Sequence, residues 1–290
     1  MHEARYEGKH FASSVHMQDA GASLWEARAL SLIKWAAMLF LIVDHVSLAL
    51  LDNLYIGRLL GRIAFPLFAY MIAMGARYSS RPERYLRRIF IFALISEIPF
   101  DLMVSNIPFD LTYSNVLFTF SLALSPLVLH QRLKLKAAVS ILISLCAIVL
   151  AELAHVDYGG LGVATVLLFY FGCFGFSHED ASLDPSLLRV RLGQLLGLVP
   201  LVLIWPCWQG VLLYMQSGQF QLANTIESYA VLSLLFILFS RAKRAQFSLQ
   251  SKRRAKLWYL VYPGHIIIAV ILVYALGIYN LPEQFIRIFN

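Results

Sequence analysis

The segment IKWAAMLFLIVDHVSLALL, residues 33–51, decides the fold class. It is an apolar run long enough to cross the ~30 Å hydrocarbon core of a bilayer as one helix. Comparable runs follow it along the chain, at residues 56–76, 88–105, 114–130, 137–155, 158–176, 192–207, 225–240 and 257–279. We therefore expect an all-α fold, a polytopic transmembrane helical bundle of about nine spans.

The composition supports this fold class. Of the 290 residues, 59% are hydrophobic and only 14% are charged, whereas about 25% are charged in an average soluble domain. These values exclude a soluble globular protein. Three cysteines, Cys146, Cys173 and Cys207, lie singly within or beside apolar runs, so neither a disulfide framework nor a zinc site is expected.

The basic residues predict the orientation in the membrane. Most of the 24 Lys and Arg residues lie in the amino-terminal extension and in alternate connections, and cytoplasmic loops of membrane proteins are enriched in these residues. We expect an N-in/C-out chain with a polar cytoplasmic extension (1–32), a transmembrane domain (33–279) and a short tail (280–290). The net charge of +7 then reflects topology in the lipid bilayer, and no nucleic acid partner is expected.

Ionisable side chains interrupt the apolar runs toward the outer side of this topology. Such groups are costly at membrane depth and usually face a cavity or a partner. We expect a polar pocket at the midplane or open to the outside. It would be lined by Asp44, His45, Arg58, Arg62, Glu97, Asp101, Asn115, Glu152, His155, Asp157 and Tyr158.

Asp44 and His45 are the sharpest of these signals. Neighbouring positions on a helix point in different directions, so the two side chains should have separate partners. We expect Asp44 to stay ionised beside Arg58 or Arg62 of the next span, and His45 to be neutral and able to accept a proton. This pattern predicts a base and a structural ion pair.

Two other acidic pairs leave their roles open. Glu97 and Asp101 share one helix face and are candidates for proton carriers, cation ligands or partners of the arginines. Glu152 and His155 form one E-x-x-H, the spacing of di-iron bundles, but the sequence has no second copy. We therefore expect no metal.

The inner side carries the segment RPERYLRR, which places Arg84, Arg87 and Arg88 on successive turns. Guanidinium groups bind phosphate through paired hydrogen bonds, although the positive-inside rule also explains such a cluster. Near the last run, YLVYPGH places His265 after a proline and a glycine. For this residue a buried, hydrogen-bonded histidine is the commoner explanation.

Taken together, several blocks resemble the TraX family of multispanning membrane proteins over about residues 30–275. These blocks are LSLIKW, LIVDHV, GRIAFPLFAY, ISEIPFD, NVLFTF, DYGGLGV and YPGH. That family includes the F-type conjugative pilin acetylase, and a looser similarity extends to acyltransferase-3 enzymes. The resemblance implies a multi-pass acetyltransferase of the bacterial inner membrane, with acetyl-CoA as donor and a pilin or another membrane or periplasmic molecule as acceptor.

The resemblance also implies roles for individual residues. His45 matches the catalytic histidine, and Arg84 with Arg87 matches the basic motif associated with acyl-CoA. His45 would deprotonate the acceptor during direct transfer, an acetyl-histidine relay remaining open, and Arg62 or Asn115 would stabilise the oxyanion. The expected sites are catalytic His45 and Asp44; acetyl-CoA-binding Arg62, Arg84, Arg87, Arg88 and His265; and acceptor-binding Arg58, Glu97, Asp101, Asn115, Asp157 and Tyr158.

Three alternatives remain at this stage. The first is an O-acetyltransferase for a glycan or lipid. The second is a proton-coupled secondary transporter, since intramembrane acids and histidines also form proton relays. Such transporters often carry inverted repeats, and the sequence shows none. The third is a noncatalytic assembly factor for a pilus or secretion machine.

Overall fold

The computed structural model describes residues 31–51, 54–105, 112–176, 185–217, 226–241 and 252–277. Every regular element in these ranges is a helix, and one isolated parallel bridge joins Ser114 to Val156. The expected all-α fold is therefore confirmed for the described residues. The tail 280–290 and all but the last two residues of the extension 1–32 lie outside them.

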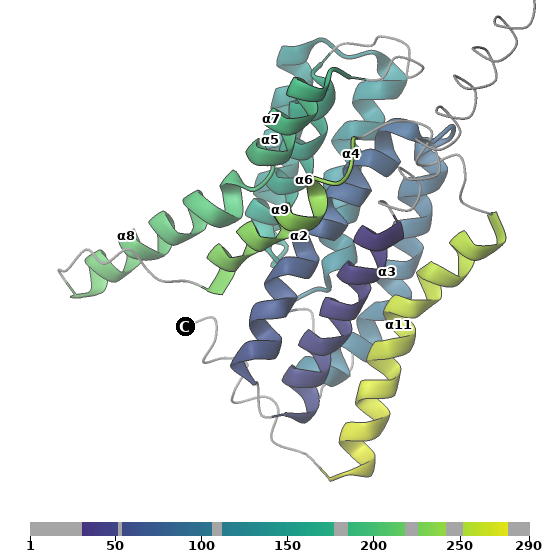
Figure 1. Ribbon diagram of the computed structural model, residues 1–290, viewed down its shortest axis with the longest axis vertical. Helices are drawn as coiled ribbons and strands as arrows, with labels where there is room; N and C mark the ends of the chain where they lie inside the picture. Colours follow the sequence, from purple (N-terminus) through teal and green to yellow (C-terminus); the bar gives the residue numbers. More distant parts are fainter. Residues whose placement is uncertain are drawn as a thin grey trace, which may run out of the picture.

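The helices follow the expected runs (Figure 1). In chain order they are Ser31–Leu50 (the first helix), α2 (Tyr55–Tyr78), α3 (Pro82–Val104), α4 (Val116–Leu133), α5 (Ala137–Leu153), α6 (Gly159–Phe174), α7 (Leu187–Leu196), η1 (Pro200–Ile204), α8 (Trp205–Ser217), η2 (Ile226–Ser233), α9 (Leu234–Ile237) and α11 (Lys252–Ala275). Within the described ranges, four stretches are long and apolar enough to cross a membrane: Ser31–Leu50, Tyr55–Tyr78, Val116–Leu133 and Leu187–Gln216.

The expected count of about nine spans therefore stays a prediction, and two of the expected runs differ from the structure. The run predicted at 192–207 belongs to a longer helical stretch, from α7 through the π-helical turn η1 to α8, and α8 projects away from the bundle (Figure 1). Pro200 begins the π-helical turn, consistent with a proline that has no amide hydrogen to donate. The run predicted at 225–240 contains the 3₁₀ helix η2 and the single turn of α9, and together these two helices fall short of ~30 Å.

Helix α5 illustrates how the chain divides its side chains between lipid and protein. Its buried residues are all small: Ser140, Ser144, Ala147 and Ala151. Its large apolar residues are exposed, among them Leu142, Leu145, Val149 and Leu150. Small residues let neighbouring helices approach closely, while exposed leucines suit a hydrocarbon environment. This pattern fits a multi-pass membrane protein.

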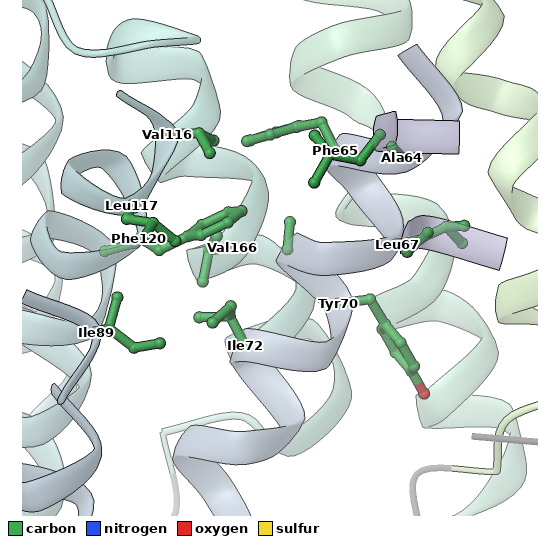
Figure 2. Packing of buried hydrophobic residues seen from close by; sticks show 14 of the residues in the cluster. Ala64, Phe65, Leu67, Tyr70, Ile72, Ile89, Val116, Leu117, Phe120 and Val166 are labelled. Atoms are coloured by element: carbon green, nitrogen blue, oxygen red, sulfur yellow. The ribbon is translucent and has the colours of Figure 1, made fainter. Parts of the chain in front are cut away.

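Helix α2 is the central element, packed against α4, α6 and η2. Figure 2 shows Phe65 and Ile72 pointing from α2 toward Ile89 of α3 and Phe120 of α4, whereas Tyr70 points the other way. All five side chains are buried. The apolar packing on both sides fixes α2 in place, and its first turns then carry the charged residues of the site.

The glycines of α2 bring it close to the first helix. A Cβ atom at Gly57 would overlap the side chain of Ser47, and one at Gly61 would overlap the carboxyl group of Asp44. The small-x-x-x-small spacing of these glycines, read from the sequence, is thus used for close helix contact. It also places the following arginines beside the polar residues of the first helix.

Candidate functional site

Two histidines from opposite ends of the chain contact each other. Nδ1 of His45, on the first helix, lies 2.7 Å from Nε2 of His265 on α11. Nδ1 of His265 lies 2.8 Å from the carbonyl oxygen of Val261. The sequence indicated both histidines separately and placed His265 in the acetyl-CoA site, but nothing in it indicated that they form a pair.

A buried ion pair lies next to the histidines. Arg58 donates from Nη1 to Oδ1 of Asp44 at 2.6 Å, and the two side chains are only 7% and 12% exposed. The ion pair expected between Asp44 and an arginine of the next helix is therefore present, with Arg58 as the partner. Since the carboxylate of Asp44 faces α2, it does not orient the ring of His45.

Arg62, one turn further along α2, contacts the start of α6. Its Nη1 donates to the hydroxyl of Tyr158 at 3.1 Å, and its guanidinium carbon lies 5.5 Å from the centre of that ring. The Tyr158 ring also stacks on Phe65, with ring centres 3.8 Å apart. Tyr158 has a φ of +60° at the amino end of α6, and this left-handed turn directs the chain into the helix.

Glu97 and Asn115 join α3 to α4. Asn115 caps α4 by accepting from the backbone amide of Leu117 at 3.0 Å, while its side-chain nitrogen donates to Glu97 and to the carbonyl of Ala93. Its backbone amide also donates to Glu97, at 3.1 Å. These hydrogen bonds account for Asn115 as a helix cap, so its acceptor-binding and oxyanion roles stay predictions. Asp101 is buried at the far end of α3.

Asp157 lies in the connection that enters α6. The hydroxyl of Tyr113 donates to its Oδ1 at 2.5 Å. Its backbone amide donates to the carbonyl of Ser114 at 2.8 Å, next to the Ser114–Val156 bridge. Thr119 of α4 donates to its carbonyl oxygen. The connection is thus held firmly against the start of α4, and Asp157 lines the cavity described next.

A cavity of about 390 Å³ links this polar region to the opposite end of the bundle. One face of the first helix lines it throughout, through Lys34, Met38, Leu41 and His45. Three turns separate Lys34 from His45, a distance of about 16 Å. Apart from these residues, Asp44, Asp157, Tyr158 and Tyr262 line the His45 end; Tyr78, Ser79 and Tyr85 line the Lys34 end; and the walls between are apolar.

Few of the residues predicted from the sequence line this cavity. Those that do are Asp44, His45, Asp157 and Tyr158. Arg58 and Arg62 do not line the cavity but contact residues that do, Arg58 through Asp44 and Arg62 through Tyr158. The cavity is also lined by Lys34, Tyr78, Tyr85 and Tyr262, which were not predicted as site residues. The sequence does contain a signal for Lys34, because its spacing from His45 places both residues on one face of the helix.

The predicted acetyl-CoA arginines lie elsewhere. Arg84, Arg87 and Arg88 are exposed at the start of α3 and do not line the cavity. Beside them Glu83 accepts a hydrogen bond from Nε of Arg132 at 3.0 Å, and this bond lowers the pKa of the Glu83 carboxyl group. The three arginines therefore lie near the Lys34 end of the cavity but outside it.

Glu152 and His155 do not form a helical E-x-x-H pair. Helix α5 ends at Leu153, so Glu152 and His155 do not share a helix face, and Glu152 accepts instead from the backbone amide of Gly160 at 2.9 Å. Among the residues that the structure describes, no three His, Cys, Asp or Glu side chains form a group that could hold a metal ion.

Comparison with known proteins identifies the family. A family model described as TraX protein matches residues 29–273, which is most of the chain. No curated protein and no solved structure matches it. The matched range contains both histidines, the buried ion pair and every residue that lines the cavity.

Proposed function

The chain belongs to the TraX protein family, and from that premise we propose that it is a membrane-embedded acetyltransferase. It would move an acetyl group from cytoplasmic acetyl-CoA to an acceptor at the midplane or periplasmic side of the bacterial inner membrane. The observation that carries this proposal is the cavity between Lys34 and His45. It would let a donor enter from one side of the bundle and react near its middle.

The shape and lining of the cavity suit the donor. Its walls are apolar between the two ends, which fits a pantetheine arm and its thioester better than a charged solute. Lys34, at the end of the cavity opposite His45, would supply a positive charge that binds a phosphate. Because Arg84, Arg87 and Arg88 are exposed at the same end, they would attract the phosphates of the nucleotide.

His45 would act as the general base. Its ring would take a proton from the acceptor amine as the nitrogen attacks the thioester carbonyl; the carbon–sulfur bond then breaks, and the proton leaves with the CoA sulfur. Base catalysis of this kind contributes roughly 10² to 10⁴-fold. The guanidinium group of Arg62 contacts the hydroxyl of Tyr158. Its positive charge would stabilise the negative charge that develops on the thioester oxygen in the cavity.

The acceptor would reach the His45 end of the cavity from the outer side, because the basic residues predict that the Lys34 end faces the cytoplasm. Family membership favours the amino-terminal amine of a pilin. Asp157 lines the same end of the cavity, and its carboxyl group would accept a hydrogen bond from the neutral amine and hold it near His45.

Transfer of labelled acetyl groups tests the proposal. Purified protein in detergent or nanodiscs would be incubated with radiolabelled acetyl-CoA and candidate pilins, with glycans and lipids as competing acceptors, and with the His45→Gln protein as control. We expect CoA release and a labelled pilin amine. Labelled glycan or lipid hydroxyls would instead indicate an O-acetyltransferase. Proton-driven solute uptake into liposomes, without any acetyl transfer, would indicate a transporter and overturn the proposal.

A further inference from the structure

We propose that His265 is a positioning residue that fixes which nitrogen of His45 is free to accept a proton. The inference rests on the proposed role of His45 as base and gives His265 a function different from acetyl-CoA binding. It follows from the hydrogen-bond chain that runs from Val261 through His265 to His45.

The hydrogen-bond chain begins at the carbonyl oxygen of Val261, which can only accept a hydrogen bond. A backbone carbonyl has no proton, so Nδ1 of His265 must donate to the oxygen of Val261, 2.8 Å away. A neutral imidazole carries one N–H, and Nε2 of His265 is therefore an acceptor. Since that atom lies 2.7 Å from Nδ1 of His45, His45 must donate from Nδ1. The lone pair of neutral His45 is then on Nε2.

The ring geometry supports a hydrogen bond rather than a stacking contact. The two ring planes differ by only 18° and the ring centres are 4.8 Å apart, but the 2.7 Å between Nδ1 of His45 and Nε2 of His265 is too short for a contact between stacked ring faces and has the length of a hydrogen bond. Tyr262 contacts both rings edge-on, with centre distances of 6.5 Å to His45 and 5.6 Å to His265. The ring of Tyr262 therefore packs against both histidines and helps to hold them in place.

The free nitrogen belongs to a ring that lines the cavity. His45 is among the lining residues, and in the described part of the chain no hydrogen bond to its Nε2 is present. When Nε2 takes a proton, the positive charge spreads over the ring, and the Nδ1–H bond to His265 strengthens. His265 would therefore stabilise the imidazolium, as a carboxylate does in a serine-protease triad. Asp44 cannot do so, because its carboxylate pairs with Arg58.

Two substitutions of His265 separate this role from a structural one. In His265→Gln the amide oxygen can reach the position of Nε2 and accept from His45, whereas in His265→Asn the shorter side chain reaches only the position of Nδ1. We expect kcat of His265→Asn to fall by ~10² or more while KM for acetyl-CoA stays within about two-fold. His265→Gln should keep kcat within about ten-fold of wild type.

Other results would overturn the inference. If both variants keep wild-type kcat, His265 does not assist His45; if both raise KM and leave kcat unchanged, His265 contacts the donor instead. Inactivity of His45→Gln together with a fully active His265→Asn would reject only this inference. Full activity of His45→Gln would reject the base itself.

A measurement on the wild-type protein does not depend on how the variants fold. ¹⁵N NMR of protein labelled at histidine, with the signals of His45 assigned by their loss in His45→Gln, reports which ring nitrogen carries hydrogen. We expect hydrogen on Nδ1 of both His45 and His265. Hydrogen on Nε2 of His45 would overturn the proposal.

Discussion

Arg58 donates a hydrogen bond to Asp44 at 2.6 Å between two helices of the bundle, and both side chains are almost fully buried. The contact is possible because Gly61 has no side chain where the carboxyl group of Asp44 lies. In a buried pair each charge compensates the desolvation of the other, so the loss of one partner costs far more than the loss of both. The ion pair therefore joins the first helix to α2 and leaves His45 to the cavity.

Replacement of Asp44 by Asn should destabilise the protein. The change removes the charge but keeps the size of the side chain, and it leaves the guanidinium of Arg58 buried without its counter-ion. Breaking a buried pair in this way costs about 3–5 kcal/mol. We expect a lower melting temperature in detergent and a reduced yield of inserted protein.

The double variant Asp44→Asn, Arg58→Gln is the control for this prediction. Because both charges are removed together, it should melt at a higher temperature than Asp44→Asn alone. If Asp44→Asn has the same melting temperature as the wild-type protein, the ion pair contributes nothing to stability.

A side chain at position 61 should also separate the two helices. A Cβ atom at Gly61 would overlap the Asp44 carboxyl group, whereas one at Gly264 of α11 would meet no atom within 4 Å. We expect Gly61→Ala to lower the stability by about 1–3 kcal/mol, and Gly264→Ala to leave it almost unchanged. Thermal unfolding of the two variants side by side provides the measurement, and equal melting temperatures would contradict the proposed packing.

Part of this site could be predicted from local sequence. The pairing of Asp44 with an arginine follows from two adjacent spans and from the cost of charge in a membrane. The contact between His45 and His265 could not be predicted, because 220 positions separate the residues and nothing in the sequence indicates that the first helix and α11 lie side by side.

The donor site shows a second limit of sequence reasoning. Arg84, Arg87 and Arg88 form a conspicuous cluster, but side chains at the start of a helix can point outward, and these are exposed. Lys34 is a single lysine at the start of an apolar run, which usually marks only the membrane boundary. The cavity gives it a candidate function, since it lies on the same helix face as His45.

Lys34→Gln should therefore weaken use of the donor. Because Lys34 would contact a phosphate and not the reacting atoms, we expect KM for acetyl-CoA to rise about ten-fold, equivalent to about 1.4 kcal/mol, with a smaller change in kcat. The triple replacement of Arg84, Arg87 and Arg88 by Gln should weaken acetyl-CoA binding as well, most visibly at low salt. Initial rates against acetyl-CoA concentration at two salt concentrations test both. An unchanged KM in the triple variant would assign those arginines to topology alone.

The predicted orientation can be tested at the two ends of α5. Lys134 lies just before this helix and His155 just after it, and both are exposed. In a background with Cys146, Cys173 and Cys207 replaced by Ser, a cysteine at 155 should react with an impermeant maleimide from the outside. A cysteine at 134 should react only after the membrane is permeabilised. Labelling of both from the same side would contradict the N-in topology.

His45→Gln separates an enzyme from a transporter most directly. Glutamine has a similar size and is neutral, so the protein should insert and keep much of its affinity for acetyl-CoA, because the buried ion pair beside it is unchanged. It cannot accept a proton as imidazole does, and we expect acetyl transfer to fall by ~10² or more. Transfer rates and acetyl-CoA binding, measured on the same preparation, provide the test. Loss of rate with binding retained would support the assignment of His45 as base. If transfer stays within a few-fold of wild type, the base must be another group near His45, and His265 and Asp157 would be the next residues to replace.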